Sequence, residues 1–362
     1  MKNAILFRDV AVLTGTLSAS LILTPVARRI AVRAGLVDRP APRKFHREPT
    51  PYLGGLAVAL VVLVSIALET AAHPNLRGRI LAFGAGATLV GATGLIDDWR
   101  SLGVRPRVAV QAAAAMLLWL AGIRLTPSGF APIDLAVTIF VVVLVTNSVN
   151  LLDNMDGLAA GTVAIAAICY FFMAERQGQE LIAPLALSVA GACIGFLRYN
   201  FPPARIFLGD AGSLLLGFCA ATLLIEVNLP SHPLPTRVAA QALVLAVPLF
   251  DTILVVVSRR RGGRPVLQGG TDHLSHRLTR LGLTPRGTAV AIYVAGAACG
   301  GLALALLRPK GSLPSIAVLV ALAGAVPILI GALERDPTHP SETSRIANTP
   351  SRARDTLRGR LS

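Results

Sequence analysis

The amino-acid sequence predicts an all-α protein that crosses a membrane many times. Of its 362 residues, 54% are hydrophobic and only 15% are charged. The mean hydropathy is +0.65, and this composition is too apolar for a soluble globular protein. Apolar runs also recur at lengths near the ~20 residues that a helix needs to span a bilayer. These observations favour a polytopic membrane protein.

About eleven apolar segments are predicted to be transmembrane helices. The first is too long for a signal peptide and has no small-residue cleavage site before the next loop, so we expect it to be retained. The segments centre on residues 10–27, 56–72, 80–96, 108–123, 133–146, 158–173, 181–197, 214–227, 238–257, 289–307 and 316–333.

The distribution of Lys and Arg predicts the orientation. The C-terminal tail and the loops after the first, third, seventh and ninth segments carry 25 of the 34 Lys and Arg residues. Because positively charged loops stay on the cytoplasmic side, we expect the N-terminus outside and the C-terminus inside. This bias and anionic lipid explain the net charge of +15 more simply than a nucleic-acid partner, so none is expected.

We predict a transmembrane domain over residues 1–334 and a basic tail over residues 335–362. The tail is rich in Arg, Ser, Thr and Pro, which is typical of a disordered segment. Its expected role is that of a charged cytoplasmic tail that helps to fix the topology.

The most unusual stretch, residues 147–158, places two carboxylates and three amides between two apolar runs. Polar groups at a membrane edge are costly and are candidates for function. Asn147, Asn150, Asp153 and Asp156 follow a three-residue spacing, which groups side chains on one face of a helical turn. The stretch is either a solvated loop with helix caps or a site for a metal ion and a phosphorylated ligand.

The loop after the first segment combines basic side chains with prolines. Lys44 and His46 lie among several prolines, which hold a loop in a defined shape. Gly54 and Gly55 open the next segment and permit the close approach of another backbone. The pattern suits an anion-binding loop, whereas positive-inside bias alone accounts for its arginines.

Asp97 and Asp98 stand side by side at the end of the third segment. Two adjacent carboxylates repel each other, and the negative end of the helix dipole adds to the repulsion. The pair is therefore either an exposed pair balanced by Arg100 and Arg105, or a partner for a metal ion or a basic group.

The loop after the seventh segment ends in the run Gly-Asp-Ala-Gly-Ser at residues 209–213. Asp210 or Ser213 is a candidate helix N-cap. Gly209 and Gly212 also suit a tight turn that presents Asp210 to a ligand. Backbone amides at a helix N-terminus favour phosphate.

The loop after the ninth segment carries His273 and His276, whose spacing places both on one helical face. Two histidines without further ligands are a weak zinc signal, whereas imidazoles beside arginines suit a phosphate. Asp251 lies inside the ninth segment and is expected either to pair within the bundle or to line the cleft.

These polar clusters all follow odd-numbered segments, so the loops that carry them share one side of the membrane. We expect them to converge on the cytoplasmic side, as in an enzyme that acts where a soluble donor meets a membrane-bound acceptor. A bare structural protein has no need of this arrangement. A transporter is the alternative, but it would need polar groups near the midplane and an internal repeat. The sequence offers only Asp251 and no convincing repeat.

With these residues in view, the chain resembles the polyprenyl-phosphate N-acetylhexosamine-1-phosphate transferases, the glycosyltransferase family 4 group. The likeness covers residues 35–283. It consists of residues 38–40 and 43–46, Asp97 with Asp98, residues 147–158, Asn200 with residues 203–204 and 207–213, Pro248 with Asp251 and Thr252, and residues 273–278. Each element is weak alone, but all six occur in order at family-like spacing.

The resemblance implies that the protein transfers a sugar 1-phosphate from a UDP-N-acetylhexosamine to a polyprenyl phosphate and releases UMP. It implies Mg²⁺ as the cofactor, with Mn²⁺ as a substitute, held by Asn150 and Asp210. It also implies a catalytic centre formed by Asp97, Asp98 and Asp153, in which the two adjacent carboxylates lie at the lipid phosphate.

The resemblance further implies residues that bind the substrates. Asp156, Asn200 and Phe207 would meet the uridine, with Phe207 stacked on uracil. His273, His276 and Arg277 would contact phosphate or sugar, and Lys44 and His46 occupy a basic position of the family.

The resemblance is nearer to the N-acetylglucosamine branch than to the alternative muramoyl-pentapeptide branch, which usually has a triple histidine in the last loop. Three departures bear on the sugar: Asn154 stands where Gly is common, Ser275 replaces a middle His, and Gly270 occupies the position of an Asp. The implied setting is the lipid bilayer of a bacterial inner membrane, with a homodimer as one option. The implied role is the first membrane step of cell-envelope polysaccharide synthesis.

Overall fold

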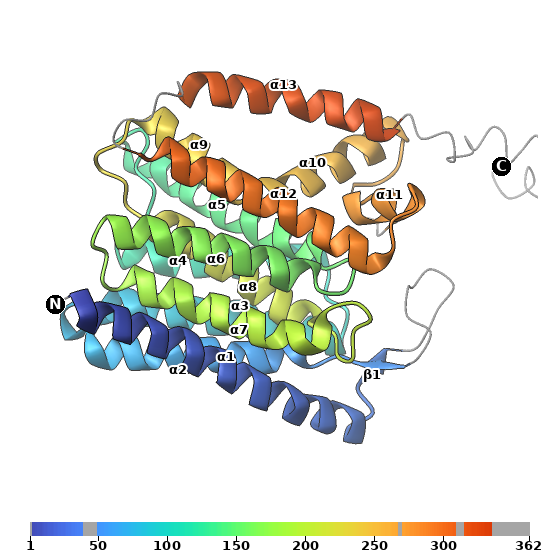
Figure 1. Ribbon diagram of the computed structural model, residues 1–362, viewed down its shortest axis with the longest axis horizontal. Helices are drawn as coiled ribbons and strands as arrows, with labels where there is room; N and C mark the ends of the chain where they lie inside the picture. The colour runs from blue at the N-terminus through green and yellow to red at the C-terminus, as the bar shows by residue number, and fades with distance from the viewer. Residues whose placement is uncertain (1, 39–48, 267–269, 309–314, 335–362) are drawn as a thin grey trace, which may run out of the picture. The chain divides into compact units, whose positions relative to one another are not determined.

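The structure, a computed structural model, describes residues 2–38, 49–266, 270–308 and 315–334 and is almost entirely helical over these ranges (Figure 1). The helices are α1 (Lys2–Arg33), α2 (Gly54–Ala72), η1 (Pro74–Leu76), α3 (Arg77–Trp99), α4 (Val104–Leu120), α5 (Ala131–Leu152), α6 (Leu158–Arg176), α7 (Ile182–Asn200), α8 (Gly209–Glu226), α9 (Leu234–Val244), α10 (Ala246–Arg261), α11 (Leu274–Arg280), α12 (Pro285–Leu306) and α13 (Ser315–Glu334). Strands β1 (Val37–Asp38) and β2 (Thr50–Pro51) form a small antiparallel ribbon.

The chain divides into two compact units, Met1–Val320 and Ala321–Ser362. The boundary falls inside α13, and the structure describes the second unit only as far as Glu334. The predicted basic tail, residues 335–362, lies outside the described residues. Every site residue discussed below belongs to the first unit.

The polytopic, mostly helical architecture is confirmed, whereas the predicted number of about eleven spans is not. Among the described residues, eight helices are long and apolar enough to cross a membrane: α1, α2, α3, α5, α6, α7, α8 and α12. Helices α9 and α10 make a ninth if they form one span, although they are bent by 78°. Helix α4 has 17 residues, or about 26 Å, which is short of the ~30 Å hydrocarbon core.

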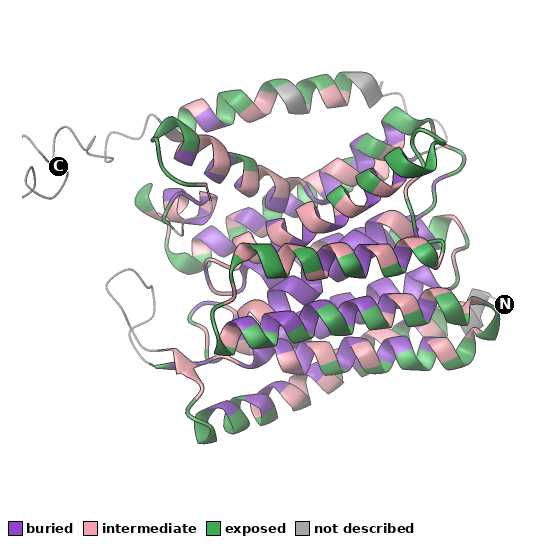
Figure 2. Cartoon of the chain, turned by 180° about the vertical axis from the view of Figure 1, so that it is seen from behind, coloured by how far each residue is buried: buried purple, intermediate pink, exposed green. Residues whose placement is uncertain are grey.

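Helices α6, α7 and α8 form the interior of the first unit and are mostly buried (Figure 2). Helix α7 packs against α1 and α6, and α8 packs against α3 and α5. The outer helices carry large apolar side chains on their exposed faces, including Leu68, Leu81 and Phe140. An apolar outer face is what lipid-exposed helices require.

Glycines bring α2 and α3 against the beginning of α8. A Cβ atom on Gly55 would lie 2.2 Å from the backbone nitrogen of Gly212, and one on Gly94 would lie 2.3 Å from the carbonyl oxygen of Asp210. Any larger residue would push these backbones apart. The expectation that Gly54 and Gly55 permit a close backbone approach is therefore confirmed.

The segment before α8 also pairs with the β ribbon. The N–H of Phe207 donates to the carbonyl of Pro51 at 2.9 Å, and the N–H of Gly54 donates to the carbonyl of Phe207 at 3.0 Å. Tyr52 and Phe207 form a parallel bridge. This pairing fixes the loop after α7 against the loop after α1, although the two are more than a hundred residues apart in sequence.

Candidate active site

The segments that follow α1, α3, α5, α7 and α10 meet around one cavity at one end of the first unit (Figure 1). The cavity has a volume of about 980 Å³. It is lined by Val37, Asp38, Tyr52, Asp97, Asp98, Ser101, Asn150, Asp153, Asn154, Met155, Asp156, Asn200, Phe207, Leu208, Gly209, Asp210, Gly270, Thr271 and His276. The predicted convergence of the odd-numbered loops is therefore confirmed.

The cavity is strongly acidic. Six of its lining residues are aspartates, and among the described residues that line it there is no Lys or Arg. Burial, together with the negative charges of Asp210, Asp98 and Asp156, raises the pKa of Asp153 well above its ordinary value. Carboxylates gathered in this way favour a cation in their midst.

Asp98 lies at the N-terminus of α8. Its two carboxylate oxygens accept hydrogen bonds from the backbone N–H groups of Asp210, at 2.8 Å, and Ala211, at 3.0 Å. The first N–H groups of a helix have no intrahelical partner, and the positive end of the dipole favours an anion there. Gly209 is at φ 71°, a conformation that residues with a Cβ rarely adopt. A Cβ there would also lie 2.7 Å from an oxygen of Asp98, so this turn requires glycine.

Asp97, which is buried, has a different partner. Its carboxylate lies 2.6 Å from the guanidinium of Arg107 on α4 and also accepts the backbone N–H of Leu102. The sequence suggested Arg100 and Arg105 as the balancing charges. The basic partner that the structure shows is Arg107, two residues further along.

Asn150 and Asp210 lie together, as the resemblance implies. The amide of Asn150 donates to Asp210 at 2.6 Å and to the hydroxyl of Ser213 at 2.8 Å. Within the described ranges, no three His, Cys, Asp or Glu side chains form a ready-made metal site. Mg²⁺, however, needs few protein ligands, prefers oxygen and keeps water and phosphate oxygens. This pair, in a cavity with surplus carboxylates, fits that ion.

Asn200 and Asp156 connect the two loops that supply most of the cavity wall. Asn200, which is 2% exposed, accepts the N–H of Gly157 at 2.9 Å and donates to the carbonyl of Ile206 at 3.0 Å. Asp156 accepts the N–H of Ala204 at 2.8 Å. Both are among the three residues predicted to meet the uridine; both line the cavity, and both also hold its walls together. Phe207 lines the cavity as well.

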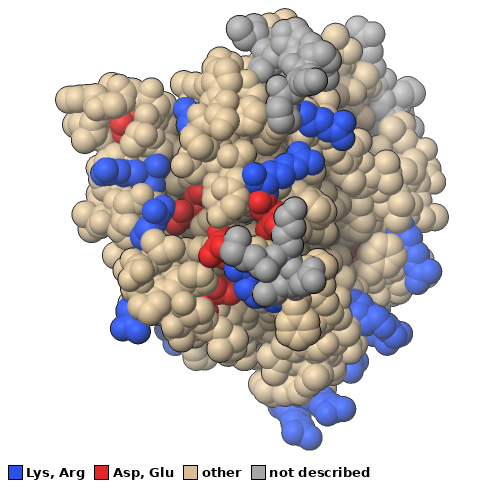
Figure 3. Space-filling model, turned by 60° about the vertical axis from the view of Figure 1, so that its left-hand side comes forward, with Lys and Arg blue, Asp and Glu red and all other residues tan. Residues whose placement is uncertain are grey.

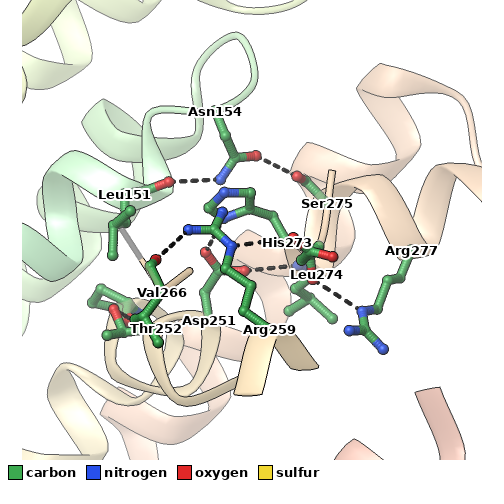
Figure 4. A network of polar contacts seen from close by, with 12 residues as sticks. Leu151, Asn154, Asp251, Thr252, Arg259, Val266, His273, Leu274, Ser275 and Arg277 are labelled. Atoms are coloured by element: carbon green, nitrogen blue, oxygen red, sulfur yellow. Dashed lines mark hydrogen bonds and ion pairs between the residues drawn. The ribbon is translucent and has the colours of Figure 1, made fainter. Parts of the chain in front are cut away.

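The short helix α11 is attached to α10 through Asp251 (Figure 4). Asp251 is fully buried. Its carboxylate lies 2.8 Å from Nδ1 of His273 and accepts the N–H of Leu274 at 2.7 Å. Of the two alternatives for Asp251, pairing within the bundle is therefore correct. His273 is committed to this pair and does not line the cavity.

Asp272 forms a second connection between α10 and the segment before α11. Its carboxylate accepts hydrogen bonds from Arg259, at 3.1 Å, and Arg264, at 2.6 Å. Burial opposes ionisation, but these hydrogen bonds and charges lower the pKa of Asp272 below its ordinary value. Arg277 donates to the backbone carbonyl of Asp272 at 3.0 Å, is buried and is not among the lining residues.

His276 is the residue of α11 that reaches the cavity. Its ring centroid lies 6.0 Å from that of His273. Burial, with the nearby His273 and Arg280, lowers the pKa of His276 to about 4. The imidazole is therefore neutral near pH 7 in the absence of an anionic ligand.

Besides His273 and Arg277, three predicted or suspected positions fall away from the cavity or outside the described residues. Lys44 and His46 lie in the segment that the structure does not describe. Asn147 shares the spacing of Asn150, but its amide donates to Gln111 of α4 at 2.6 Å and it does not line the cavity. A three-residue spacing drifts around a helix that has 3.6 residues per turn, so Asn147 belongs to a neighbouring face.

Sequence reasoning assigned no role to Arg107 and treated Asn154 and Ser275 only as departures from the family pattern. In the structure Arg107 pairs with Asp97, and the hydroxyl of Ser275 donates to the side-chain oxygen of Asn154. No periodicity in the sequence marks either contact, because each joins residues on separate helices or loops.

The opposite end of the first unit, which carries the N-terminus, has a different charge pattern (Figure 3). Carboxylates there lie beside basic groups: Asp9 is 2.9 Å from Arg8, Glu69 is 3.1 Å from His73, and Glu226 is 2.7 Å from Arg79. Each of these carboxylates has a basic side chain within 3.1 Å, whereas the described lining of the cavity contains no Lys or Arg. The acidic cavity at the other end is the stronger candidate for a site that binds a ligand.

Comparison with known proteins agrees with this choice. Residues 80–228 match glycosyl transferase family 4, and this range contains Asp97, Asp98, Asn150, Asp153 and Asp210. A protein of Bacillus subtilis strain 168, named a probable undecaprenyl-phosphate N-acetylglucosaminyl 1-phosphate transferase, is 32% identical over 305 residues, which are 82% of this chain and 84% of the relative.

Two further relatives have similar names. The decaprenyl-phosphate N-acetylglucosaminephosphotransferase of Mycolicibacterium smegmatis is 31% identical, over 86% of this chain and 85% of its own. The undecaprenyl-phosphate alpha-N-acetylglucosaminyl 1-phosphate transferase of Escherichia coli K12 is 27% identical, over 75% and 76%. From these similarities over most of its length, the chain belongs to glycosyl transferase family 4, in the branch of the polyprenyl-phosphate N-acetylglucosaminyl 1-phosphate transferases.

Proposed function

We propose that this protein transfers N-acetylglucosamine 1-phosphate from UDP-N-acetylglucosamine to undecaprenyl phosphate, or to another polyprenyl phosphate, and releases UMP. The observation that carries the proposal is the cavity itself. Five segments that are far apart in sequence bring six aspartates together at one end of a membrane-type helical bundle, in a chain whose relatives are named for this activity.

The reaction joins two anions. An oxygen of the lipid phosphate attacks the phosphorus that carries the sugar, a new P–O bond forms, and the bond from that phosphorus to the UMP oxygen breaks. The second pKa of a phosphate monoester is ~6, so the attacking lipid phosphate is already largely ionised near neutral pH. The reaction therefore needs positioning and charge neutralisation more than a strong general base.

The contacts of Asp97 and Asp98 support positioning roles for both. Asp98 uses its two oxygens to hold the backbone at Asp210. Asp97 lines the cavity and, through its ion pair with Arg107 on α4, holds the end of α3 against α4. The competing mechanism is a two-step route through an aspartyl-phosphate. Exchange of labelled UMP into the donor in the absence of lipid would indicate that route.

We assign Mg²⁺ to Asn150 and Asp210, which lie together in the cavity wall. When bound, the ion would neutralise charge on the diphosphate and polarise its P–O bonds. Ser213 supports the amide of Asn150 from the first turn of α8. The turn at Gly209 sets the position of Asp210 relative to Asp98.

We place the cavity on the cytoplasmic face of the bacterial inner membrane, with the N-terminus outside. The support is the distribution of Lys and Arg, 25 of 34 of which lie in the tail and in loops at the cavity end of the predicted topology. UDP-sugars are water-soluble, whereas the acceptor is anchored in the bilayer, so a cavity at the membrane edge is accessible to both.

The test is a reconstituted reaction. Purified protein in detergent is mixed with Mg²⁺, undecaprenyl phosphate and a panel of UDP-sugars, and UMP release is measured together with the mass of the lipid product. We expect release with UDP-N-acetylglucosamine only when the lipid phosphate is present. Failure of every UDP-sugar to give lipid-dependent UMP would refute the proposal, and a product mass from UDP-N-acetylmuramoyl-pentapeptide would reassign the branch.

A further inference from the structure

Two of the three residues that depart from the family pattern, Asn154 and Ser275, are in direct contact. The hydroxyl of Ser275 in α11 donates to the side-chain oxygen of Asn154 (Figure 4). Asn154 lies in the loop between α5 and α6, residues 153–157, which we call the acidic loop. The amide nitrogen of Asn154 donates to the carbonyl of Leu151 at 2.8 Å, at the end of α5. Asn154 therefore connects the end of α5 to α11 and uses both polar atoms to do so.

The contact lies in the cavity wall. Asn154 lines the cavity, and so do its loop neighbours Asp153 and Asp156. Ser275 is fully buried and directly precedes His276, the residue of α11 that lines the cavity. A change in the distance between this loop and α11 would therefore move His276 relative to the carboxylates.

Helix α11 has seven residues, too few to be stable without tertiary contacts. On the side of α10 it is held by the pair Asp251–His273. Its Leu274 and Leu278 pack against an apolar cluster that includes Met155 of the acidic loop as well as residues of α5, α6, α10 and α12. These contacts attach α11 to the scaffold, and the bond from Ser275 to Asn154 adds a polar contact to the apolar contact between α11 and the acidic loop.

We propose that Asn154 and Ser275 form a clasp of positioning residues that fixes α11 against the acidic loop and so sets the width of the donor-binding cavity at His276. The inference rests on the proposed function for its catalytic readout. The clasp touches the wall that contains His276 and the loop of Asp153 and Asp156. It is therefore expected to affect the donor more than the lipid acceptor.

The kinetic test compares Ser275→Ala, Asn154→Ala and the double variant. We expect each single change to raise the KM for UDP-N-acetylglucosamine by roughly 3- to 10-fold, the range set by loss of one hydrogen bond. The KM for undecaprenyl phosphate should stay within about twofold. Because both changes break the same bond, the double variant should be no worse than the worse single variant. Ser275→Thr, which keeps the hydroxyl, should recover most of the affinity.

Thr279→Ala is the matched control. Thr279 lies on the same short helix, and its hydroxyl bonds the carbonyl of His276 rather than the acidic loop. Effects of Ser275→Ala and Asn154→Ala that multiply in the double variant, equal increases in both KM values, or an effect of Thr279→Ala as large as that of Ser275→Ala would each overturn the clasp.

Hydrogen exchange of the backbone amides of residues 274–280 supplies a readout that is independent of catalysis. Ser275→Ala and Asn154→Ala should each accelerate exchange there, and Thr279→Ala should do so less. If wild-type protein released no UMP, the proposed function would fail while this measurement still decided the clasp. Unchanged exchange in both clasp variants would refute it even if the enzyme were active.

Discussion

The carboxylate of Asp98 accepts the backbone N–H of Asp210 at 2.8 Å, so the last turn of α3 caps the first turn of α8. The second oxygen of Asp98 accepts the N–H of Ala211 at 3.0 Å. A carboxylate in this position stabilises a helix N-terminus by roughly 0.5–2 kcal/mol. Here it also fixes the backbone of the residue to which we assign the metal.

The variant Asp98→Asn should weaken metal binding as well as turnover. Its NH₂ group cannot accept a hydrogen bond, so one of the two amides of α8 loses its partner and the position of Asp210 relaxes. We expect the Mg²⁺ concentration for half-maximal rate to rise several-fold, measured by titrating Mg²⁺ at saturating substrates. A loss of rate with an unchanged Mg²⁺ requirement and a shifted pH profile would instead indicate that Asp98 is a base.

Gly209→Ala tests the same contact from the other side. Its Cβ would approach an oxygen of Asp98 to 2.7 Å, and the residue would have to adopt φ 71°. It should therefore reproduce the raised Mg²⁺ requirement without removing a carboxylate.

The variant Asp210→Asn should lose nearly all activity, because an amide oxygen is a neutral and weaker ligand for a hard cation. A metal contributes several kcal/mol to stabilisation of the transition state, so a loss of more than about 100-fold is expected. The check is UMP release across a Mg²⁺ series. Ser213→Ala, which removes only a partner of Asn150, should cost less. Full activity of wild-type protein after chelation would contradict the metal assignment.

The variant Arg107→Met should destabilise the protein, because it leaves the buried carboxylate of Asp97 without its cation. The loss is expected to be on the order of 1–3 kcal/mol, read as a lower Tm in detergent. The variant Asp97→Asn/Arg107→Met removes both charges and should be more stable than Arg107→Met alone. Equal stabilities for these two variants would show that the pair contributes little.

His276 should not titrate in the usual range of histidine. Burial and its neighbours lower its pKa from the ordinary 6.5 to about 4. The folded protein thus binds this proton less readily than the unfolded chain, so the penalty on stability is absent above pH 6.5 and grows as the pH falls towards 4. The ratio of the wild-type kcat/KM to the His276→Gln kcat/KM, which reports groups of the free enzyme, should be constant from pH 8 to pH 6. A ratio that changes with a midpoint near 6.5 would show that the imidazole becomes charged there.

Much of the fold could be predicted because the bilayer places simple requirements on the length and polarity of the helices that span it. Spanning helices must be long and apolar. Ten of the eleven predicted segments each overlap one helix of the structure, whereas the ninth covers both α9 and α10. The number of complete spans was harder to predict. Hydropathy averages over a window, and it registers neither the 78° bend between α9 and α10 nor the early end of α4. The β ribbon depends on pairing with residues from a distant loop, which no local pattern reveals.

Much of the site could also be predicted, because the odd-numbered loops must emerge on one side. That rule brought Asp97, Asn150 and Asp210 into one cavity. It could not predict which side chains take up a partner inside the protein. His273 pairs with Asp251, and Asn147 turns to Gln111. Both outcomes depend on helix rotation and on contacts between elements that are distant in sequence.

The cavity is lined by segments that follow α1, α3, α5, α7 and α10, and this arrangement has a consequence for biosynthesis. A chain that emerges from the ribosome and inserts helix by helix has no site until the residues after α10 are in place. The protein is therefore expected to be active only after the helices up to α10 and the residues that follow them have been inserted. A truncated chain that ends after α8 would retain Asp98, Asn150 and Asp210 but would lack the wall that contains His276. In a cell, an incompletely inserted chain of this kind would not consume polyprenyl phosphate.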